Sequence, residues 1–371
     1  MGLKVGIIGL PNVGKSTLFN AIMGKQAALT APYPFATIEP NVGVVDVPDN
    51  RLDQLHQALV KNPRSGVTKE IPIVYSSIQF VDIAGLVKGA AEGNGLGNKF
   101  LSHIRDVDLI LHVLRDFEAE GIPRHQDSRD PEHDAKIVET ELGLKDLEVK
   151  EKAEKSKSPA AYSLLLNKPV IYAMNVGEDK LGEFSEHLEN QRSRDGAVPV
   201  LGFSDPPAGG PVLRSSEFSG SPSFLDGKHI LYFSAKIEEQ IAQLSKIEQK
   251  EYLKVYGLET SGLDRIITEC FHRLGLISFF TAPASAKAPA EQAGKWEIRA
   301  WSVRKNSLAP QAAGVIHSDF EKLFIRTEII EWQKLAACGS WPEAKEKGLV
   351  RTEGRDYVIQ DGDVCNFLIG K

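Results

Sequence analysis

Gly9-Leu10-Pro11-Asn12-Val13-Gly14-Lys15-Ser16 decides the fold, because it fits the G-x-x-x-x-G-K-[ST] phosphate-binding pattern. The apolar run at residues 5–8 predicts a buried strand entering this stretch, and residues 16–23 predict a helix leaving it. Gly9 and Gly14 permit backbone angles that turn successive N–H groups toward an anion, and the helix N-terminus adds partial positive charge. A glycine-rich turn with a chance lysine is the alternative, and the strand-loop-helix context disfavours it.

The residue types in this stretch predict a nucleoside triphosphate cradle with a divalent cation beside it. Lys15 would reach the outer phosphates as a point charge. The Ser16 hydroxyl would complete a Mg²⁺ shell filled mostly by water and phosphate oxygens. The expected nucleotide-binding residues here are Asn12, Val13, Gly14, Lys15, Ser16 and Thr17.

Composition describes a mildly acidic protein of two or three domains. The 371 residues carry a formal net charge of −6, which predicts no global attraction to nucleic acid. Cys270, Cys338 and Cys365 show no metal-ligand spacing, so we expect a reducing intracellular compartment. The sequence has no charged-then-apolar leader and no apolar stretch long enough to span a bilayer. We therefore expect a cytoplasmic protein without membrane contact.

Two loops downstream complete the expected phosphate site. The proline-rich loop at residues 31–41 carries Thr37, which can close over the γ-phosphate and add a Mg²⁺ ligand. An ordinary surface loop is the alternative. The apolar strand at 77–81 runs into Asp82, which would hold Mg²⁺ through water, and the Gly85 N–H would meet the γ-phosphate. Glycines at 89, 93, 95 and 97 indicate a mobile segment, as a switch would require.

Further strands are expected at 108–114, 169–174 and 229–233. Ligands of an open parallel sheet lie beyond the carboxyl ends of its strands, so the loops that follow should converge on one nucleotide. Two of these loops carry the expected base-binding residues. They are Asn175, Val176 and Glu178 in one loop and Ser234, Ala235 and Lys236 in the other.

Together the stretches 9–17, 34–41, 82–90, 175–178 and 234–236 resemble the YchF family, the Obg-like ATPases of the translation-factor GTPase class, as does 309–322. The resemblance covers most of the chain. It implies an α/β fold, with a P-loop NTPase parallel sheet flanked by helices and a small β-grasp domain of the TGS type. We expect the NTPase domain at 1–276 and the TGS domain at 278–371. The resemblance also implies association with the ribosome or ribosomal RNA, and we expect a monomer.

Two regions depart from the family pattern. The long helical arm of the family is expected to be truncated in the region near 139–168, where only a short Lys/Glu-rich stretch at 149–166 remains and Pro159 interrupts it. A Ser/Pro/Gly-rich segment near 191–228 is expected to be an exposed insertion. After helices at 237–276, strand-like pieces occur at 297–303, 324–330, 357–359 and 364–369. Basic residues there form either an RNA-binding face or scattered surface charges. They are Lys322, Arg326, Lys345, Lys347, Arg351 and Arg355.

The base-reading loop predicts ATP over GTP. Guanine-specific relatives carry N-K-x-D where this chain has Asn175-Val176-Gly177-Glu178. Glu178 is one methylene longer than the aspartate that pairs with guanine, and Val176 lacks the lysine stem that packs over the base. Guanine would leave donors imperfectly paired. A permissive site that binds both nucleotides is the alternative.

Catalysis is expected to be slow. Leu86 stands where many GTPases carry the glutamine that orients the attacking water, and it has no donor or acceptor. His125 is the loop histidine nearest to one that the family uses, and a solvated surface histidine is the alternative. Asn12 matches an asparagine that helps some related GTPases hold K⁺, so a K⁺ requirement stays open. The chain is either a Mg²⁺-dependent hydrolase coupled to a switch or a GTP- or dual-specificity ribosome-binding adaptor whose hydrolysis is incidental.

Overall fold

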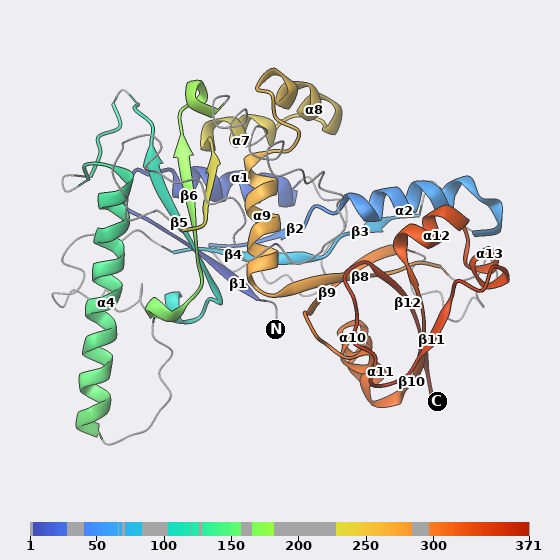
Figure 1. Ribbon diagram of the computed structural model, residues 1–371. Helices are drawn as coiled ribbons and strands as arrows, with labels where there is room; N and C mark the ends of the chain where they lie inside the picture. The colour runs from blue at the N-terminus through green and yellow to red at the C-terminus, as the bar shows by residue number, and fades with distance from the viewer. Residues whose placement is uncertain are drawn as a thin grey trace. The chain divides into compact units, whose positions relative to one another are not determined.

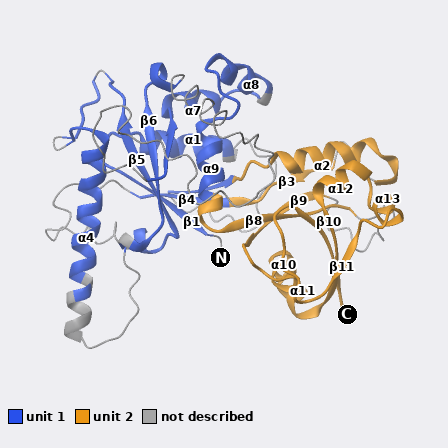
Figure 2. Ribbon diagram, in the orientation of Figure 1, with its two compact units in different colours: residues 1–45, 78–270 blue, residues 46–77, 271–371 orange. Residues whose placement is uncertain are grey.

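The structure is a computed structural model of the chain. It describes residues 3–27, 41–65, 67–68, 71–83, 103–119, 121–125, 128–156, 165–181, 228–283 and 297–370. The chain divides into two compact units, one formed by residues 1–45 and 78–270 and the other by 46–77 and 271–371 (Figure 2). Neither unit is a continuous piece of sequence, because the segment 46–77 leaves the first unit and the chain then returns to it.

The first unit is built on a six-stranded sheet with the order β2-β4-β1-β5-β6-β7 (Figure 1). Strand β1 pairs in parallel with β4 and β5, and β5-β6 and β6-β7 are also parallel. Strand β5 is buried along nearly its whole length, as is typical of a parallel sheet with both faces covered. The strands are β1 (Lys4–Ile8), β2 (Val42–Asp46), β4 (Ser77–Asp82), β5 (Leu109–Asp116), β6 (Val170–Val176) and β7 (Ile230–Phe233).

Helices pack on this sheet through apolar side chains. Leu114 and Tyr172 of the sheet share a buried cluster with Ile237 and Leu253, which lie in two helices that follow β7 in the same unit. The helices found between residues 235 and 273 confirm the prediction of helices in that region. The helices are α1 (Lys15–Ala27), α4 (Pro131–Ser156), α7 (Ala235–Ile241), α8 (Lys246–Val255) and α9 (Gly262–Arg273).

Helix α4 occupies the region where a shortened arm was expected. It begins after Asp130, whose carboxylate accepts a hydrogen bond from the His133 N–H at 2.7 Å, and Pro131 fits the first helical position. The helix has 26 residues and ends at Ser156, three residues before Pro159. Residues 157–164, and 182–227 with most of the expected Ser/Pro/Gly-rich insertion, lie outside the described part of the chain.

The second unit contains a mixed sheet with the order β11-β10-β12-β8-β9-β3. Strand β10 pairs antiparallel with β11 and β12, β8 pairs antiparallel with β9, and β12-β8 and β3-β9 are parallel. Its strands are β3 (Ile73–Val74), β8 (Leu276–Thr281), β9 (Ile298–Arg304), β10 (Phe324–Glu331), β11 (Arg351–Glu353) and β12 (Asp363–Ile369). Its helices are α2 (Asn50–Lys61), α10 (Ala309–Ile316), α11 (Ser318–Leu323), α12 (Trp332–Cys338) and α13 (Trp341–Glu346).

The domain boundary predicted from sequence needs correction. Residues 46–77 were assigned with the NTPase domain at 1–276, but they belong to the C-terminal unit. Strand β3 pairs with β9, and Leu52, Leu55 and Leu59 of α2 share a buried cluster with the C-terminal sheet. The Arg51 guanidinium also bridges Asp49 and Asp361, at 2.8 and 2.6 Å. Whether this unit is a TGS domain stays a prediction.

The strands of the C-terminal region differ from the sequence prediction in two ways. Residues 357–359 do not form a regular strand. The Tyr357 carbonyl accepts from the Ala309 N–H at the start of α10, the Ile359 N–H donates to the Ser307 carbonyl, and Val358 forms an isolated bridge with Leu308. Strands β8 and β11 were not predicted. The three cysteines are buried and free. No helix among the described residues is both long enough and apolar enough to cross a membrane.

Candidate nucleotide-binding site

The loop between β1 and α1 has a backbone that glycine makes possible. Gly9 has φ +150° and Gly14 has φ +99°, which are angles that favour glycine. A Cβ at Gly9 would lie 2.4 Å from the Val113 carbonyl oxygen, and one at Gly14 would lie 2.3 Å from Asn175 Nδ2. The loop therefore packs directly against β5 and β6, and side chains at these two positions would force it away.

Lys15 begins α1 and folds back onto the loop. Its Nζ donates to the Leu10 carbonyl at 2.8 Å, and the residue is 8% exposed. Burial lowers the pKa of Lys15 to about 8, against the opposing effect of the nearby Asp82 charge. Ser16 is exposed and Thr17 is half-buried. The loop thus binds the Lys15 ammonium through its own Leu10 carbonyl, and the Ser16 residue is accessible to solvent.

Asp82 ends β4 beside the phosphate-binding loop. It pairs with Ile7 in the register of β1 and β4, and its N–H donates to the Asn41 carbonyl at 2.9 Å. Its Oδ1 is buried and has no hydrogen-bond partner among the described residues. Burial raises the pKa of Asp82, and the Lys15 charge opposes that shift.

These residues fit a divalent cation that is held mainly by a bound triphosphate. An orphaned carboxylate oxygen and an exposed hydroxyl are oxygen ligands of the kind that Mg²⁺ prefers. Within the described ranges there is no group of three or more His, Cys, Asp or Glu side chains that could hold a metal. The ion would therefore need phosphate oxygens or water to complete its shell.

Asn175 joins the phosphate-binding loop to the loop after β7. Its Nδ2 donates to the Val13 carbonyl at 2.9 Å, and its Oδ1 accepts from the Ala235 N–H at 2.9 Å. The side chain is 3% exposed, so both ends of the amide are already engaged with the protein backbone. The Asn175 side chain therefore holds the two loops together, and its amide is not free to bind a base. Val176 packs into the apolar cluster beside Leu114.

The remaining predicted base-reading residues form a charged pair. Lys236, at the start of α7, places its Nζ 3.0 Å from Oε1 of Glu178, which lies just after β6. Ser234 is buried at the N-cap of α7 and makes no side-chain capping bond. The structure thus brings Asn175, Glu178 and Lys236 to the same edge of the sheet as the phosphate-binding loop, as expected for residues at the carboxyl ends of parallel strands.

Three predicted site residues, Thr37, Gly85 and Leu86, lie outside the described residues. His125 is half-buried, and its carbonyl accepts from the Ser128 N–H at 2.8 Å. Asn12 has φ +64°, and its Nδ2 donates to the Pro123 carbonyl at 3.1 Å.

Sequence reasoning missed two buried polar residues of β5. His112 is fully buried, its ring centroid lies 5.5 Å from that of Tyr172, and burial lowers its pKa to about 3. Arg115 is 2% exposed and contacts backbone carbonyls around the phosphate-binding loop. The available signal was an arginine and a histidine within an otherwise apolar strand, where charged side chains are rarely buried without partners.

Comparison with known proteins identifies the family. Residues 4–168 match the family model described as a 50S ribosome-binding GTPase, and residues 276–370 match the model of the YchF-GTPase C-terminal region, described as a protein of unknown function. The chain is 43% identical over 383 residues to a protein of Mycoplasma genitalium named ribosome-binding ATPase YchF, covering 98% of both chains. It is 38% identical over 409 residues to the protein of that name from Bacillus subtilis, covering 99% of both.

The fold is shared as well. A solved structure described as the YchF GTPase of Schizosaccharomyces pombe superimposes with a TM-score of 0.72 and 30% sequence identity. The match covers 99% of this chain and 98% of that one. The α/β P-loop fold expected from the sequence is therefore confirmed, and the chain belongs to the YchF family.

Proposed function

We propose that this chain is a Mg²⁺-dependent nucleoside triphosphate hydrolase that prefers ATP and acts in association with the ribosome. The observation that carries the proposal is the pair of hydrogen bonds made by the Asn175 side chain. They join the phosphate-binding loop at Val13 to the start of α7 at Ala235. One side chain thereby holds the phosphate end and the base end of a nucleotide site in one arrangement. Such pre-organisation is what a P-loop hydrolase needs, because its catalysis rests on positioning and electrostatics.

The charged residues have separate tasks in this proposal. The Lys15 ammonium would exchange the Leu10 carbonyl for the outer phosphate oxygens, which are stronger acceptors for a cation. Ser16 and Asp82 would supply oxygens to Mg²⁺, and that ion, when bound, neutralises charge on the phosphates. Leu86 cannot orient water, so slow intrinsic turnover is expected. The water-positioning role of His125 stays a prediction.

The preference for ATP is supported by the state of the base-reading side chains. Guanine recognition requires a carboxylate free to accept two hydrogen bonds, whereas Glu178 is engaged by Lys236 at 3.0 Å. The Asn175 amide is bonded to the backbone at both ends. Guanine would have to displace the ion pair, while adenine, with one exocyclic donor, asks less of the carboxylate.

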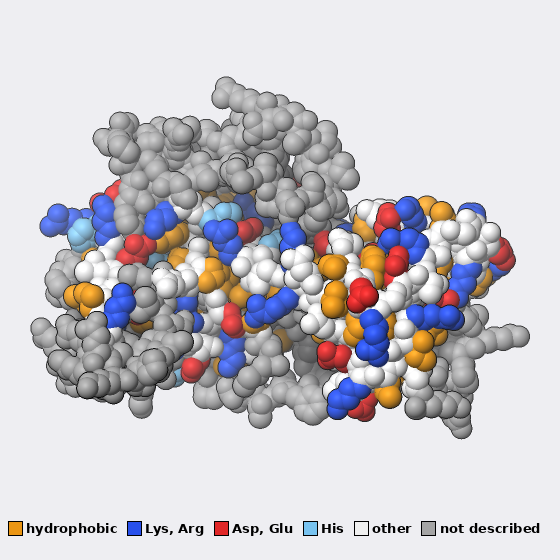
Figure 3. All heavy atoms as spheres, turned by 60° about the horizontal axis from the view of Figure 1, so that its bottom comes forward, with side chains coloured by type: hydrophobic (Ala, Val, Ile, Leu, Met, Phe, Trp, Pro, Cys, Tyr) orange, Lys and Arg blue, Asp and Glu red, His pale blue; other side chains and the backbone are white. Residues whose placement is uncertain are grey.

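The ribosome association is carried by the names of the relatives rather than by surface charge. On the face drawn in Figure 3, described basic side chains are interspersed with acidic ones. Three members of the suggested basic face have partners: Lys345 pairs with Glu328 at 2.8 Å, Arg351 pairs with Glu353 at 3.6 Å, and Arg355 donates to the Phe324 carbonyl. We therefore favour scattered surface charges over an extended RNA-binding face at these positions.

Two measurements test the proposal. Unlabelled ATP and GTP should compete against a fluorescent nucleotide, and GTP displacing the probe at a tenfold lower concentration than ATP would refute the base preference. Steady-state phosphate release should then be measured with and without ribosomes. A nucleotide-dependent adaptor is the second candidate, and it predicts ribosome binding that follows nucleotide state with no multiple turnover in either condition.

A further inference from the structure

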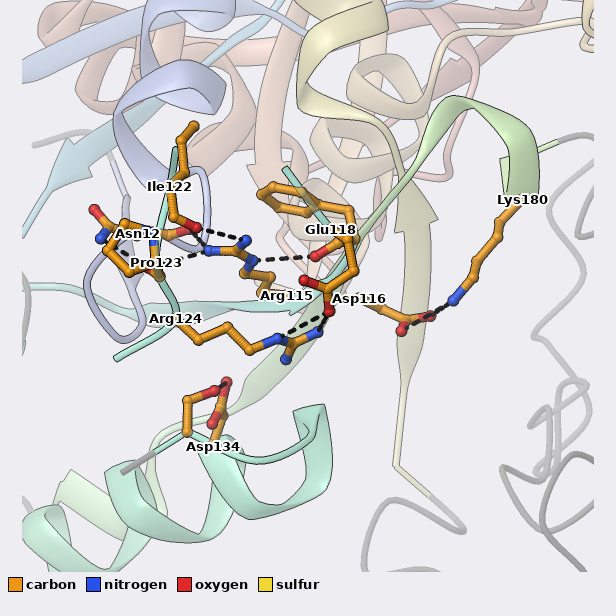
Figure 4. Close-up of polar contacts among 11 residues, drawn as sticks. Asn12, Arg115, Asp116, Glu118, Ile122, Pro123, Arg124, Asp134 and Lys180 are labelled. Atoms are coloured by element: carbon orange, nitrogen blue, oxygen red, sulfur yellow. Dashed lines mark hydrogen bonds and ion pairs between the residues drawn. The ribbon is translucent and has the colours of Figure 1, made fainter. Parts of the chain in front are cut away.

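Arg115, the penultimate residue of β5, occupies an unusual environment. Its guanidinium is surrounded by backbone carbonyls rather than by a hydrogen-bonded carboxylate (Figure 4). Nε donates to Phe117 at 3.1 Å, and Nη2 donates to Ile122 at 3.0 Å. Nη1 makes longer contacts of 3.4 Å with Asn12 and Pro123. The Phe117 ring also covers the guanidinium, 4.5 Å from its centroid.

A second bond closes this arrangement. Asn12 Nδ2 donates to the same Pro123 carbonyl, at 3.1 Å. Arg115 and Asn12 thus hold one carbonyl of the segment 121–125 between them, and Arg115 holds the Asn12 carbonyl in turn. Asn12 is the non-glycine residue of the loop with a left-handed backbone, φ +64°. The strained residue of the phosphate-binding loop is therefore fixed through both its side chain and its main chain.

Fixing a carbonyl also aims the next N–H. In a trans peptide the C=O and the following N–H point in opposite directions. Arg115 draws the Asn12 carbonyl toward β5, so the Val13 N–H points the other way. Asn175 draws the Val13 carbonyl toward β6, so the Gly14 N–H is aimed in the same manner. Two side chains thus orient two successive peptide planes of a loop whose N–H groups would bind phosphate.

The chemistry of arginine suits this task. A buried cation costs free energy unless its donors are satisfied, and the planar guanidinium meets several carbonyls at once in a fixed geometry. The neighbouring Arg124 is used differently. It pairs with Glu118 at 2.9 Å, and the Glu118 side chain is 83% exposed. That pair provides a control in the same segment.

We propose that Arg115 is a positioning residue for triphosphate binding, which holds the Asn12–Val13 peptide of the phosphate-binding loop in its anion-binding orientation. The inference rests on the proposed function, since it assigns a role within that nucleotide site. Arg115 touches no substrate in this account. It acts through Asn12 and through the 121–125 segment.

The test compares Arg115→Ala and Arg115→Lys with Glu118→Gln and the wild type. Binding of fluorescent Mg·ADP and of a slowly hydrolysed ATP analogue is measured, together with kcat and KM. Both Arg115 variants should bind at least about tenfold more weakly, as expected for loss of charge-assisted hydrogen bonds. Glu118→Gln should bind like the wild type. Guanidinium ion at a non-denaturing concentration should restore binding to Arg115→Ala and leave Arg115→Lys unchanged, because only the alanine variant offers the vacated space.

Asn12→Gly keeps a left-handed backbone accessible and removes only the bond to Pro123. A double-mutant cycle of Asn12→Gly with Arg115→Lys should show losses in binding free energy that are not additive, since both residues hold the same segment. This cycle carries the test if Arg115→Ala does not fold. Arg115 variants that bind as the wild type does, or a strictly additive cycle, would overturn the inference. A wild type that binds no nucleotide would instead refute the proposed function.

Discussion

The Asp82 N–H donates to the Asn41 carbonyl at 2.9 Å, and this bond joins the last residue of β4 to the residue immediately before β2. This bond holds the backbone of Asp82 in place. The Oδ1 atom of its carboxylate is buried and accepts no hydrogen bond within the described part of the chain. Between these two residues the chain contributes α2 and β3 to the other unit. The point from which the Asp82 side chain extends is thus fixed by a backbone bond that does not involve the carboxylate.

Asp82→Asn should have opposite effects on the stability of the protein and on its response to Mg²⁺. Burial raises the pKa of Asp82, so its contribution to stability is present at low pH and is lost as the pH rises through the folded-state pKa. At neutral pH the carboxylate is therefore a cost, and the amide should raise the melting temperature of the nucleotide-free protein. The dependence of nucleotide binding on Mg²⁺ should become weaker, because the ion would keep its phosphate, water and Ser16 ligands but lose the Asp82 charge. Calorimetric titration with Mg²⁺ or with EDTA checks this, and an unchanged Mg²⁺ dependence would contradict the metal assignment.

Lys15 predicts a characteristic pH profile. Its folded-state pKa of about 8 lies below that of an exposed lysine, so its contribution to stability falls as the pH drops from about 10 to about 8. Phosphate binding has the opposite requirement, because only the ammonium form attracts the anion. Nucleotide affinity should be level below pH 8 and fall above it, by up to about tenfold per pH unit. Lys15→Ala should nearly abolish binding, and its residual affinity should lack this slope.

Asn175→Ala should damage both the fold and the site. It leaves the Val13 carbonyl and the Ala235 N–H without partners in a buried place, which costs about 2–4 kcal/mol of unfolding free energy. Nucleotide affinity should fall in addition, since the two loops are no longer joined. Asn167→Ala is the matched control, because Asn167 is exposed just before β6. Chemical unfolding and nucleotide titration measure the two effects, and equal behaviour of the two variants would refute the bridging role.

Much of the site could be predicted because it depends on local pattern. The glycine, lysine and serine of the phosphate-binding loop, and Asp82 at a strand end, are each recognisable from their immediate neighbours. The order of parallel strands then brings Asn175 and Lys236 to the same edge. Residue type at the end of a strand therefore carried most of the information.

What could not be predicted depends on distant partners. Strand β3 has only two residues, and its partner β9 lies more than 200 residues later, so nothing near residue 73 reveals the pairing. Strand β8 has six residues, four of them apolar, and so short a run could equally belong to a buried helical segment, because periodicity cannot separate the two. Arg115 was missed because its acceptors are backbone carbonyls, which every residue has.

The assignment of residues 46–77 to the C-terminal unit can be tested through Arg51. Its guanidinium bridges Asp49 and Asp361 in a buried cluster. Arg51→Met strands two buried carboxylates and should cost about 3–5 kcal/mol. Arg64→Met is the control on the same segment: Arg64 pairs with Glu346 at the surface and should matter little. Thermal unfolding distinguishes them, and two equally mild variants would argue against a buried anchor.

The base preference should respond to Lys236, because this residue engages the carboxylate that would otherwise face guanine. Lys236→Met removes the 3.0 Å partner of Glu178 and leaves that carboxylate free to accept a hydrogen bond from guanine, although its extra methylene still disfavours the full pairing with N1–H and the exocyclic amine. GTP affinity should then rise relative to ATP by up to about fivefold, because an exposed ion pair contributes at most about 1 kcal/mol. Lys180→Met is the matched control, since Lys180 pairs with Asp116 at 3.2 Å near the same sheet edge and does not engage Glu178. Competition of both nucleotides against one fluorescent probe gives the affinity ratio for each protein. A ratio that stays at the wild-type value in Lys236→Met would mean that the ion pair does not decide base choice, and the selectivity would have to come from the length of Glu178, from Val176 or from backbone groups.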